Sequence, residues 1–567
     1  MKINKLMIWV ICLLFAALLA GPRAAAAQPV AQDQPVGLST PEELEAFMDG
    51  LVEAQLGGLH VAGMTVSVVR DGELFFAKGY GFSDLAGRVP VSAGETLFRA
   101  GSVSKLFVWT SVMQLVEQGR LDLDTDIRTY LDFDLDTAYE EPVTLRHLMT
   151  HTPGFEDRGD GLFVRTPEEV HPLRDYLTAY IPRQVYPPGE ISAYSNYGAT
   201  LAAYIVELES GMSFNEYVEA NIFAPLGMAN SSFRQPLPPE LAGNLSTGYL
   251  YTGGQYQAGI FEYVQPYPVG SLSTTAVDMT AFMIAHLQNG SYQGAQILEE
   301  DTAREMYALQ FSHDPHLQGW GLGFMSRRPE QLQVTGHGGD TVYFHSEMQL
   351  LLDHNVGIFV STNTNTGALA RYYLVQSFMD RYFPEGSLPQ PDPQASFDPA
   401  RYTGTYFPAR MNFSTAEKSA ILFQPMVVNS TGEGRLAVSG LLGAGTTYWV
   451  PVEEGVFVST DPDLPIRSPL VFRPTLDSGS GEEGGAIRYA FTNFGAYIKQ
   501  PWYAGQTLQF GLLGLGMLFF LGAVIAVPVG GLTRRRYERM APEAIPPMPR
   551  SARWNRAKRH PRRRKTW

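Results

Sequence analysis

Apolar positions near the start of the chain predict a β-hairpin, and those that follow predict helices. Residues 64–69 and 74–77 form two short apolar runs, and Asp71-Gly72 between them suits a tight two-residue turn. Further along, apolar residues recur at helical spacing in residues 106–117, which read as an amphipathic helix, and in residues 279–284. This part of the chain therefore combines strands with helices.

A second hairpin is predicted about 280 residues later. Residues 347–352 and 356–361 flank the polar triplet Asp353-His354-Asn355. Strands at both ends with helices between them indicate an α+β fold over residues 39–382. We expect the terminal strands to share one antiparallel sheet flanked by helices, with a helical region beside it.

The pattern changes after this unit. Residues 383–396 are rich in proline, as in a linker between domains. Residues 397–500 then contain short runs of β-forming residues separated by glycine-rich turns, which predict a small all-β barrel or sandwich. This second domain shows no catalytic motif. We expect it to cover the mouth of a site in the first domain or to hold that site away from a membrane.

The N-terminal segment has the pattern of a secretory signal. Lys2 and Lys5 precede an uncharged run, and alanines at residues 25–27 offer a cleavage site, so we expect a signal peptide over residues 1–27. An uncleaved anchor is the alternative. Cys12, the single cysteine of the chain, lies in this run. Disulfides, thiolate zinc sites and cysteine nucleophiles are therefore not expected in the mature protein.

A longer uncharged segment lies near the C-terminus. As a helix at about 1.5 Å per residue, residues 510–532 would reach ~34 Å, enough to cross a bilayer. We expect a transmembrane helix over residues 508–532, followed by a cytoplasmic basic tail over residues 533–567. The chain of 567 residues has a formal charge of −15, but residues from Arg534 onward carry +11 and the rest −26. This asymmetry argues against a nucleic-acid partner and favours contact between the tail and anionic lipid.

The sharpest local motif is Ser102-Val103-Ser104-Lys105, which leads into the helix predicted over residues 106–117. Residues i and i+3 share one face of a helix, so Lys105 would lie beside the Ser102 hydroxyl. A buried lysine with a lowered pKa can take the proton of a serine and turn it into a nucleophile. On its own, however, Ser-x-x-Lys is more often a helix cap followed by a surface lysine.

Two further motifs accompany the first. Tyr194-Ser195-Asn196 follows a rigid Pro-Pro-Gly turn, and a tyrosine and an asparagine two positions apart on extended chain point to the same side. Gly336-His337-Gly338-Gly339-Asp340 precedes the second hairpin, where glycines allow a backbone to approach a ligand closely. Together these motifs supply a hydroxyl for proton transfer, an amide for substrate binding and a glycine-rich backbone.

The three motifs, in this order, resemble those of the serine β-lactamase and penicillin-binding superfamily. The closest likeness is to the branch of class C β-lactamases, D,D-carboxypeptidases, D-aminopeptidases and related esterases. Two segments in the style of this branch, residues 148–154 and 270–274, support the resemblance, which covers residues 40–382. It implies the β-lactamase/D,D-peptidase fold and a reaction that needs no metal and no cofactor.

The resemblance also implies roles for single residues. Ser102 would be acylated, and Lys105 and Tyr194 would share the proton transfers that form and break the acyl-enzyme. The backbone N–H groups of Ser102 and Asp340 would form the oxyanion hole. The site would thus be a serine hydrolase site, with catalytic residues Ser102, Lys105 and Tyr194.

The remaining motif residues would bind substrate. Asn196 would orient the substrate amide, and His337 stands where the family has the lysine of its Lys-Thr-Gly triplet, followed by Gly338 and Gly339. A histidine is mostly neutral at pH 7, so it would hold a substrate carboxylate more weakly than an ammonium group does. This departure shifts the expectation away from an efficient β-lactamase. We expect the Asp340 carboxylate, a second departure, to turn away into a local hydrogen bond.

The sequence thus predicts a membrane-anchored, extracytoplasmic serine hydrolase acting on a small-molecule or peptide substrate with an amide or ester bond. Peptides of D-amino acids are one candidate class of substrate. An esterase of the same fold is one alternative, and a penicillin-recognising sensor that does not turn over is another. The histidine pairs His147/His151 and His313/His316 lack a third ligand at motif spacing, so no metal site is expected from them.

Overall fold

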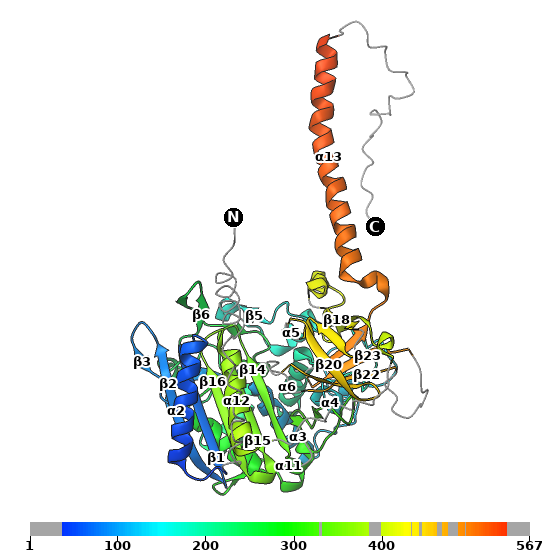
Figure 1. Ribbon diagram of the computed structural model, residues 1–567. Coiled ribbons are helices and arrows are strands. Elements are labelled where there is room, and N and C mark those ends of the chain that lie inside the picture. Colours follow the sequence, from blue (N-terminus) through cyan, green and yellow to red (C-terminus); the bar gives the residue numbers. More distant parts are fainter. Residues whose placement is uncertain are drawn as a thin grey trace, which may run out of the picture.

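The computed structural model describes residues 37–540, apart from 328–331, 385–397, 424, 432–433, 442–444, 462–467, 475–485 and 494. An α+β domain, a closed β-barrel and a long helix follow one another along the chain (Figure 1). The expected signal peptide, most of the expected linker and the basic tail beyond residue 540 lie outside the described residues.

The α+β domain is built on an eight-stranded sheet with the order β12-β13-β14-β15-β16-β1-β2-β3. Its strands are β1 (Gly63–Arg70), β2 (Glu73–Asp84), β3 (Val89–Pro90), β12 (Gly319–Trp320), β13 (Met325–Arg327), β14 (Val334–Asp340), β15 (His345–Leu351) and β16 (Val356–Thr362). Strand β16 pairs antiparallel with β1, with Thr362 opposite Met64. The two predicted hairpins are therefore present and share one antiparallel sheet, as expected.

The turn between β1 and β2 shows why this hairpin could be predicted. Asp71 and Gly72 both have positive φ, +52° and +82°. A two-residue turn of this kind matches the right-handed twist of the flanking strands, and Asp-Gly adopts it at low cost. The glycine-rich segment Gly336–Asp340 lies within strand β14, between β13 and β15, where the sequence indicated only a stretch before the hairpin.

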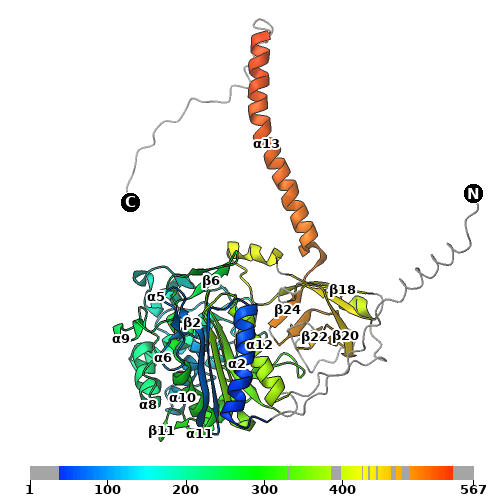
Figure 2. The same ribbon diagram turned by 60° about the vertical axis from the view of Figure 1, so that its left-hand side comes forward.

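Helices cover both faces of the sheet (Figures 1 and 2). Helices α2 (Pro41–Gly58) and α12 (Gly367–Tyr382) pack on one face, and α10 (Ala276–Leu287) packs on β1 and β16 from the other. Helix α3 (Lys105–Glu117) lies deeper, and every side chain from Lys105 to Leu115 is buried. The expectation of an amphipathic helix there was wrong, because α3 is enclosed by other helices and presents no face to water.

The rest of this domain consists of short elements. The remaining helices are α4 (Leu145–Met149), α5 (Leu173–Ala179), α6 (Asn196–Ser210), α7 (Phe214–Val218), α8 (Ala224–Leu226), α9 (Pro239–Ala242) and α11 (Glu300–Tyr307). The short strand pairs are β4 (Phe98–Arg99) with β9 (Ser273–Thr274), β5 (Phe163–Val164) with β8 (Tyr263–Val264), β6 (Tyr249–Thr252) with β7 (Gln255–Ala258), and β10 (Ser291–Tyr292) with β11 (Ala295–Gln296). Together they form the helical region that the sequence predicted.

The second domain is a closed barrel of eight antiparallel strands. They are β17 (Gly404–Pro408), β18 (Met426–Ser430), β19 (Leu436–Ser439), β20 (Thr447–Glu453), β21 (Val456–Ser459), β22 (Leu470–Arg473), β23 (Tyr489–Thr492) and β24 (Gly495–Lys499). Pairing of β17 with β24 closes the barrel, so a barrel and not a sandwich is formed. Its interior is filled by large side chains, among them Tyr402, Tyr406, Trp449 and Phe472.

The barrel packs against the segment that leads into α6. Tyr186, Ile191 and Ala193 form one buried apolar cluster with barrel residues that include Val456 and Phe491. The Tyr186 hydroxyl also donates a hydrogen bond to the backbone oxygen of Ala409, at 3.1 Å. The barrel therefore fixes the chain that carries Tyr194.

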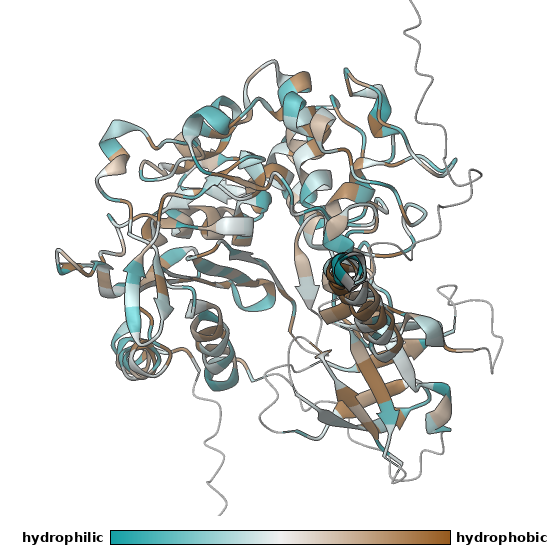
Figure 3. Ribbon diagram, turned by 90° about the horizontal axis from the view of Figure 1, so that it is seen from above, coloured by the Kyte–Doolittle hydropathy of each residue, from teal (hydrophilic) through white to brown (hydrophobic). Residues whose placement is uncertain are grey.

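Helix α13 (Gln506–Met540) projects away from both domains (Figures 1 and 2). Its residues are largely apolar, as the view along its axis shows (Figure 3). Among the described residues it is the one helix that is long and apolar enough to cross a membrane, over Gln506–Tyr537. This helix contains the uncharged segment from which a membrane span was predicted.

Candidate active site

Ser102 and Lys105 lie on one side of a tight turn. Residues Gly101–Ser104 form a 3-10 helix, η1, that runs directly into α3, so Ser102 precedes the α-helix instead of lying in its first turn. The Lys105 Nζ donates hydrogen bonds to Ser102 Oγ at 3.0 Å and to the backbone oxygen of Val269 at 2.8 Å. Because a 3-10 helix has three residues per turn, it stacks side chains i and i+3 directly. The contact expected from the spacing is therefore present.

Lys105 is held away from water. Its side chain is fully buried, and this burial lowers its pKa well below the ordinary value of 10.5. The positive charge of Arg410 lowers the pKa further, and Asp157 opposes this with a smaller effect. In the part of the chain that the structure describes, no carboxylate forms an ion pair with Lys105. A lysine in these surroundings gives up its proton readily and can act as a base.

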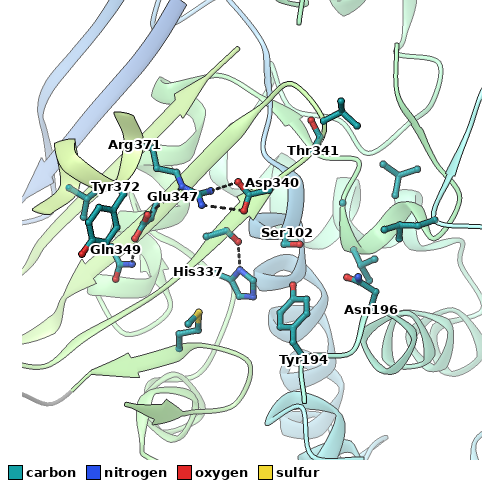
Figure 4. Close-up of a pocket in the computed structure, with 18 of the residues that line it drawn as sticks. Ser102, Tyr194, Asn196, His337, Asp340, Thr341, Glu347, Gln349, Arg371 and Tyr372 are labelled. Carbon is teal, nitrogen blue, oxygen red and sulfur yellow. Dashed lines mark hydrogen bonds and ion pairs between the residues drawn. The ribbon is translucent and has the colours of Figure 1, made fainter. Parts of the chain in front are cut away.

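Tyr194 points its hydroxyl group toward Ser102 (Figure 4). The residue after it, Ser195, caps α6 by accepting a hydrogen bond from the Gly198 N–H at 3.0 Å, which fixes the chain at this point. The Lys105 Nζ lies 5.0 Å from the centre of the Tyr194 ring. Burial raises the pKa of Tyr194 above its ordinary value of 10, so its hydroxyl stays protonated at neutral pH.

His151 supports Tyr194 from behind. The centres of the two rings lie 4.3 Å apart, and His151 Nδ1 accepts a hydrogen bond from the Ser195 N–H at 3.2 Å. Burial holds the pKa of His151 well below 6.5, so the ring is neutral. His151 thus braces the loop around Tyr194.

Two glycines bring strand β14 against the turn that contains Ser102. A Cβ atom added to Gly339 would lie 2.0 Å from the Ala100 oxygen and 2.7 Å from the Ser102 nitrogen. A Cβ added to Gly101, which has a φ of +55°, would lie 2.7 Å from the Asp340 nitrogen. No side chain fits at either position. The backbone nitrogens of Ser102 and Asp340 therefore both lie at the contact between strand β14 and the turn that contains Ser102.

His337 differs from the lysine that the resemblance would place there. Its Nδ1 lies 2.5 Å from the Gly338 oxygen, which can only accept, so Nδ1 carries the proton. Burial lowers the pKa of His337 to about 3, so the ring is neutral. The buried Nε2 then has a lone pair and no partner among the described residues. His337 can accept a hydrogen bond from a substrate, but it cannot neutralise a carboxylate.

The Asp340 carboxylate is turned toward other side chains. It accepts a hydrogen bond from His345 Nδ1 at 2.6 Å, and its Oδ1 lies 3.0 Å from Arg371 Nη1 (Figure 4). Burial alone would raise the pKa of Asp340, but the hydrogen bond from His345 and the charge of Arg371 lower it below the ordinary range. A local hydrogen bond was expected for this carboxylate, although from backbone amides and not from side chains.

Arg410, from the loop after barrel strand β17, also lines the site. Its guanidinium lies 4.7 Å from the centre of the Tyr194 ring, and its Nε donates a hydrogen bond to Asp157 at 2.8 Å. No sequence pattern pointed to this residue, because it lies in a different domain and in no motif. The second domain, which shows no catalytic motif in its sequence, therefore contributes a residue to the lining of the cleft.

These residues line a cleft of about 620 Å³ (Figure 4). Ser102, Tyr194, Asn196, His337, Gly338 and Asp340 line it, while Lys105 lies beneath Ser102 and Gly339 against the Ser102 turn. The structure thus brings together all eight residues chosen from the sequence. It adds Glu347 and Gln349 of β15, Arg371 of α12 and Arg410 of the barrel, which no local pattern identified.

The histidine pairs have structural partners. His147 Nδ1 accepts a hydrogen bond from the Thr144 N–H at 3.2 Å, and His316 Nδ1 lies 2.7 Å from Asp314 Oδ1. His313 stacks on the barrel residue Phe491, with ring centres 4.5 Å apart. Within the described ranges, no group of three histidine, cysteine, aspartate or glutamate side chains is arranged to hold a metal ion.

Comparison with known proteins places this site in a family. A family model described as Beta-lactamase matches residues 48–378, more than half of the chain. The chain is 29% identical over 224 residues to the putative penicillin-binding protein PbpX of Bacillus subtilis, covering 38% of this chain and 53% of that protein. It is 27% identical over 323 residues to protein flp of Staphylococcus aureus, covering 56% of this chain and 63% of that protein. The chain therefore spans only about half to two thirds of the length of these relatives.

Solved structures extend the likeness in fold. The octameric penicillin-binding protein homologue from Pyrococcus abyssi has a TM-score of 0.54 and 21% identity, covering 80% of this chain and all of that one. The structure of SurE has a TM-score of 0.59 and 22% identity, covering 81% of this chain and 99% of its own. The shared fold thus extends beyond the part that the family model matches. From the match over residues 48–378, the chain belongs to the beta-lactamase family.

Proposed function

We propose that this protein is a membrane-anchored, extracytoplasmic serine hydrolase that forms an acyl-enzyme at Ser102. The observation that carries the proposal is the buried Lys105 Nζ, 3.0 Å from Ser102 Oγ and without a carboxylate partner among the described residues. A lysine that is merely structural would be expected to reach water or a carboxylate, since burying an unpaired ammonium group is costly. Family membership supports serine chemistry of this class.

Acylation follows from the geometry. The neutral Lys105 amine takes the proton of Ser102 as Oγ attacks the carbonyl carbon of the substrate. The negative charge that develops on the carbonyl oxygen is stabilised by the N–H groups of Ser102 and Asp340, which the two glycines bring together. Tyr194 remains protonated, so as its hydroxyl gives its proton to the leaving group it can take up the proton held by Lys105, which leaves both groups neutral for the attack of water on the acyl-enzyme.

The substrate we propose contains an amide or ester bond, as in peptides with D-amino acids. Asn196 and the acceptor Nε2 of His337 line the cleft and can bind the two polar groups of an amide. Arg371 is occupied by Asp340 and by two backbone oxygens, whereas Arg410 is paired with Asp157 through its Nε and is half exposed. We therefore assign binding of a substrate carboxylate to Arg410. The names of relatives, which include penicillin-binding protein 4* of Bacillus subtilis, support substrates of this class.

The proposed location rests on α13 and the charge that follows it. The uncharged stretch of this helix is followed by Arg534, Arg535 and Arg536. Basic residues are retained on the cytoplasmic side of a membrane, which would leave the cleft outside the cell. Strand β5, part of which lines the cleft, lies at the same end of the molecule as α13 (Figure 1). The active site would then lie near the outer membrane surface.

The nucleophile is tested by replacing Ser102. The variant Ser102→Ala should lose all covalent labelling by a fluorescent penicillin or a fluorophosphonate, read by in-gel fluorescence, because Ser102 carries the hydroxyl oxygen that accepts the hydrogen bond from Lys105 Nζ. Ser104→Ala is the matched control, since the Ser104 hydroxyl in the same turn accepts a hydrogen bond from Leu272 and does not line the cleft. Labelling that persists in Ser102→Ala would refute the assignment.

The oxyanion hole is tested by alanine substitutions at two neighbouring glycines. Gly339→Ala should reduce acylation by about 10²–10³-fold, because its Cβ cannot fit between β14 and the Ser102 turn and the two N–H groups would separate. Gly338→Ala should have little effect, since its Cβ would meet nothing closer than Arg371 at 3.8 Å. Labelling rates of folded protein, with folding checked by circular dichroism, give the comparison. Equal rates in the two variants would contradict the account.

The electrostatic role of Arg410 is tested by the pH dependence of the acylation rate. Acylation needs neutral Lys105, so its rate should fall as pH decreases through the lowered Lys105 pKa, while neutral His337 contributes no step near neutrality. Arg410→Ala removes a positive charge that lowers the Lys105 pKa and leaves the Asp157 charge, which raises it. The Lys105 pKa should therefore increase. The acid limb of the rate–pH profile should therefore move to higher pH. Arg158→Ala, a nearby arginine paired with Asp160, should not move it. An unchanged limb in Arg410→Ala would contradict the coupling.

A further inference from the structure

A second cavity, of about 600 Å³, lies where the barrel meets the first turn of α13. Its walls come from β17, β24, the loop after β17, the 3-10 helix η8 (Ala416–Phe423) and the start of α13. Most of its lining is apolar, including Phe407, Met411, Phe413, Ile421, Leu422 and Ile498. The active-site cleft shares none of these residues, so this is a separate site.

Aromatic side chains mark the level of this cavity along α13. Phe423, Trp502 and Tyr503 are 72%, 84% and 56% exposed. Phe423 directly follows the lining residue Leu422, and Trp502 and Tyr503 directly precede the lining residue Ala504. Phe423 packs against Phe510, the first residue of the uncharged stretch, with ring centres 5.5 Å apart. Exposed tryptophan and tyrosine are typical of the interface between lipid and water. The cavity therefore opens where the helix would enter the bilayer.

One basic residue lies at this cavity. Lys418 of η8 lines it, is exposed to solvent and forms no ion pair with any residue that the structure describes. An ammonium group beside an apolar cavity at the membrane surface matches the chemistry of a phospholipid, which joins a phosphate to acyl chains. A cavity that binds a water-soluble peptide would have no reason to open at the membrane surface, so a phospholipid is the better match.

We propose that this cavity binds an acyl chain of a membrane phospholipid, with the lipid phosphate at Lys418. The proposal rests on the membrane anchoring proposed for α13. The occupant is a lipid of the bilayer because lipid is the apolar molecule present at high concentration at this level. A bound chain would bury the apolar lining that is otherwise open to water.

Occupancy of the cavity would also orient the active-site cleft relative to the membrane. The loop after β17 has two sides: Arg410 faces the cleft and the Tyr194 ring, while Met411 and Phe413 line the cavity. The loop is already fixed by the buried Glu156, whose carboxylate accepts a hydrogen bond from the Phe413 N–H at 2.6 Å. A lipid chain on the far side would hold the same loop against the membrane surface. The cleft would thereby keep a defined orientation toward the bilayer.

Photo-cross-linking of the full-length protein tests this site. The protein is reconstituted in vesicles of phosphatidylglycerol that carries a diazirine in one acyl chain, irradiated, digested and mapped by mass spectrometry. Labelling is expected in peptides from α13, which reports anchoring, and in peptides from residues 407–422, which reports the cavity. Label in α13 without label in residues 407–422 would overturn the proposal and leave the anchoring intact. No label in α13 would overturn both.

Matched variants on η8 separate the cavity from the general membrane surface. Ala416 and Ala420 are both exposed on η8, but Ala416 lines the cavity and Ala420 does not. Ala416→Trp should lower the labelling of residues 407–422 by about ten-fold, which corresponds to displacing about two methylene groups. Ala420→Trp should leave it unchanged, and both variants should keep α13 labelling and Ser102 labelling. Equal labelling of the cavity peptides in the two variants would overturn the proposal.

Discussion

The burial of Lys105 beside Ser102 is the constraint on which the rest of the site depends. An amine without water and without a carboxylate is stable only if it can lose its proton, and this makes it a base. Helix α3 provides the burial, because it runs through the centre of the domain with no face toward water. The 3-10 turn before it provides the alignment, because it stacks residues 102 and 105. Fold and chemistry therefore share one helix.

The barrel changes the electrostatics of this site from outside the domain. Its docking on residues 184–193 fixes the chain before Tyr194, and its Arg410 places a positive charge over the Tyr194 ring. The same charge helps to lower the pKa of Lys105. His337, neutral and with Nε2 as an acceptor, leaves the recognition of an anion to a residue such as Arg410. In our account the second domain is thus a component of the active site as well as a connection to α13.

The sequence revealed those features that depend on local patterns. Asp71-Gly72 can form its tight turn with little help from the rest of the fold, so the first hairpin was predictable. Closure of the barrel was not predictable, because the pairing of β17 with β24 joins segments that are far apart in the sequence. The motif residues from Ser102 to Asp340 were found because each motif pairs reactive groups at close spacing. Arg410 and Arg371 were not, because they reach the cleft through contacts more than 30 residues distant in sequence.

The central claim is that Ser102 forms an acyl-enzyme with the help of a neutral Lys105. Intact-mass spectrometry of the full-length protein, followed over time with a penicillin, a D-Ala-D-Ala peptide and a short ester, tests it most directly. The account predicts that at least one compound adds the mass of a single acyl group, that the adduct maps to the peptide containing Ser102, and that the mass then returns to its starting value. An adduct on another residue, or no adduct with any compound, would contradict it.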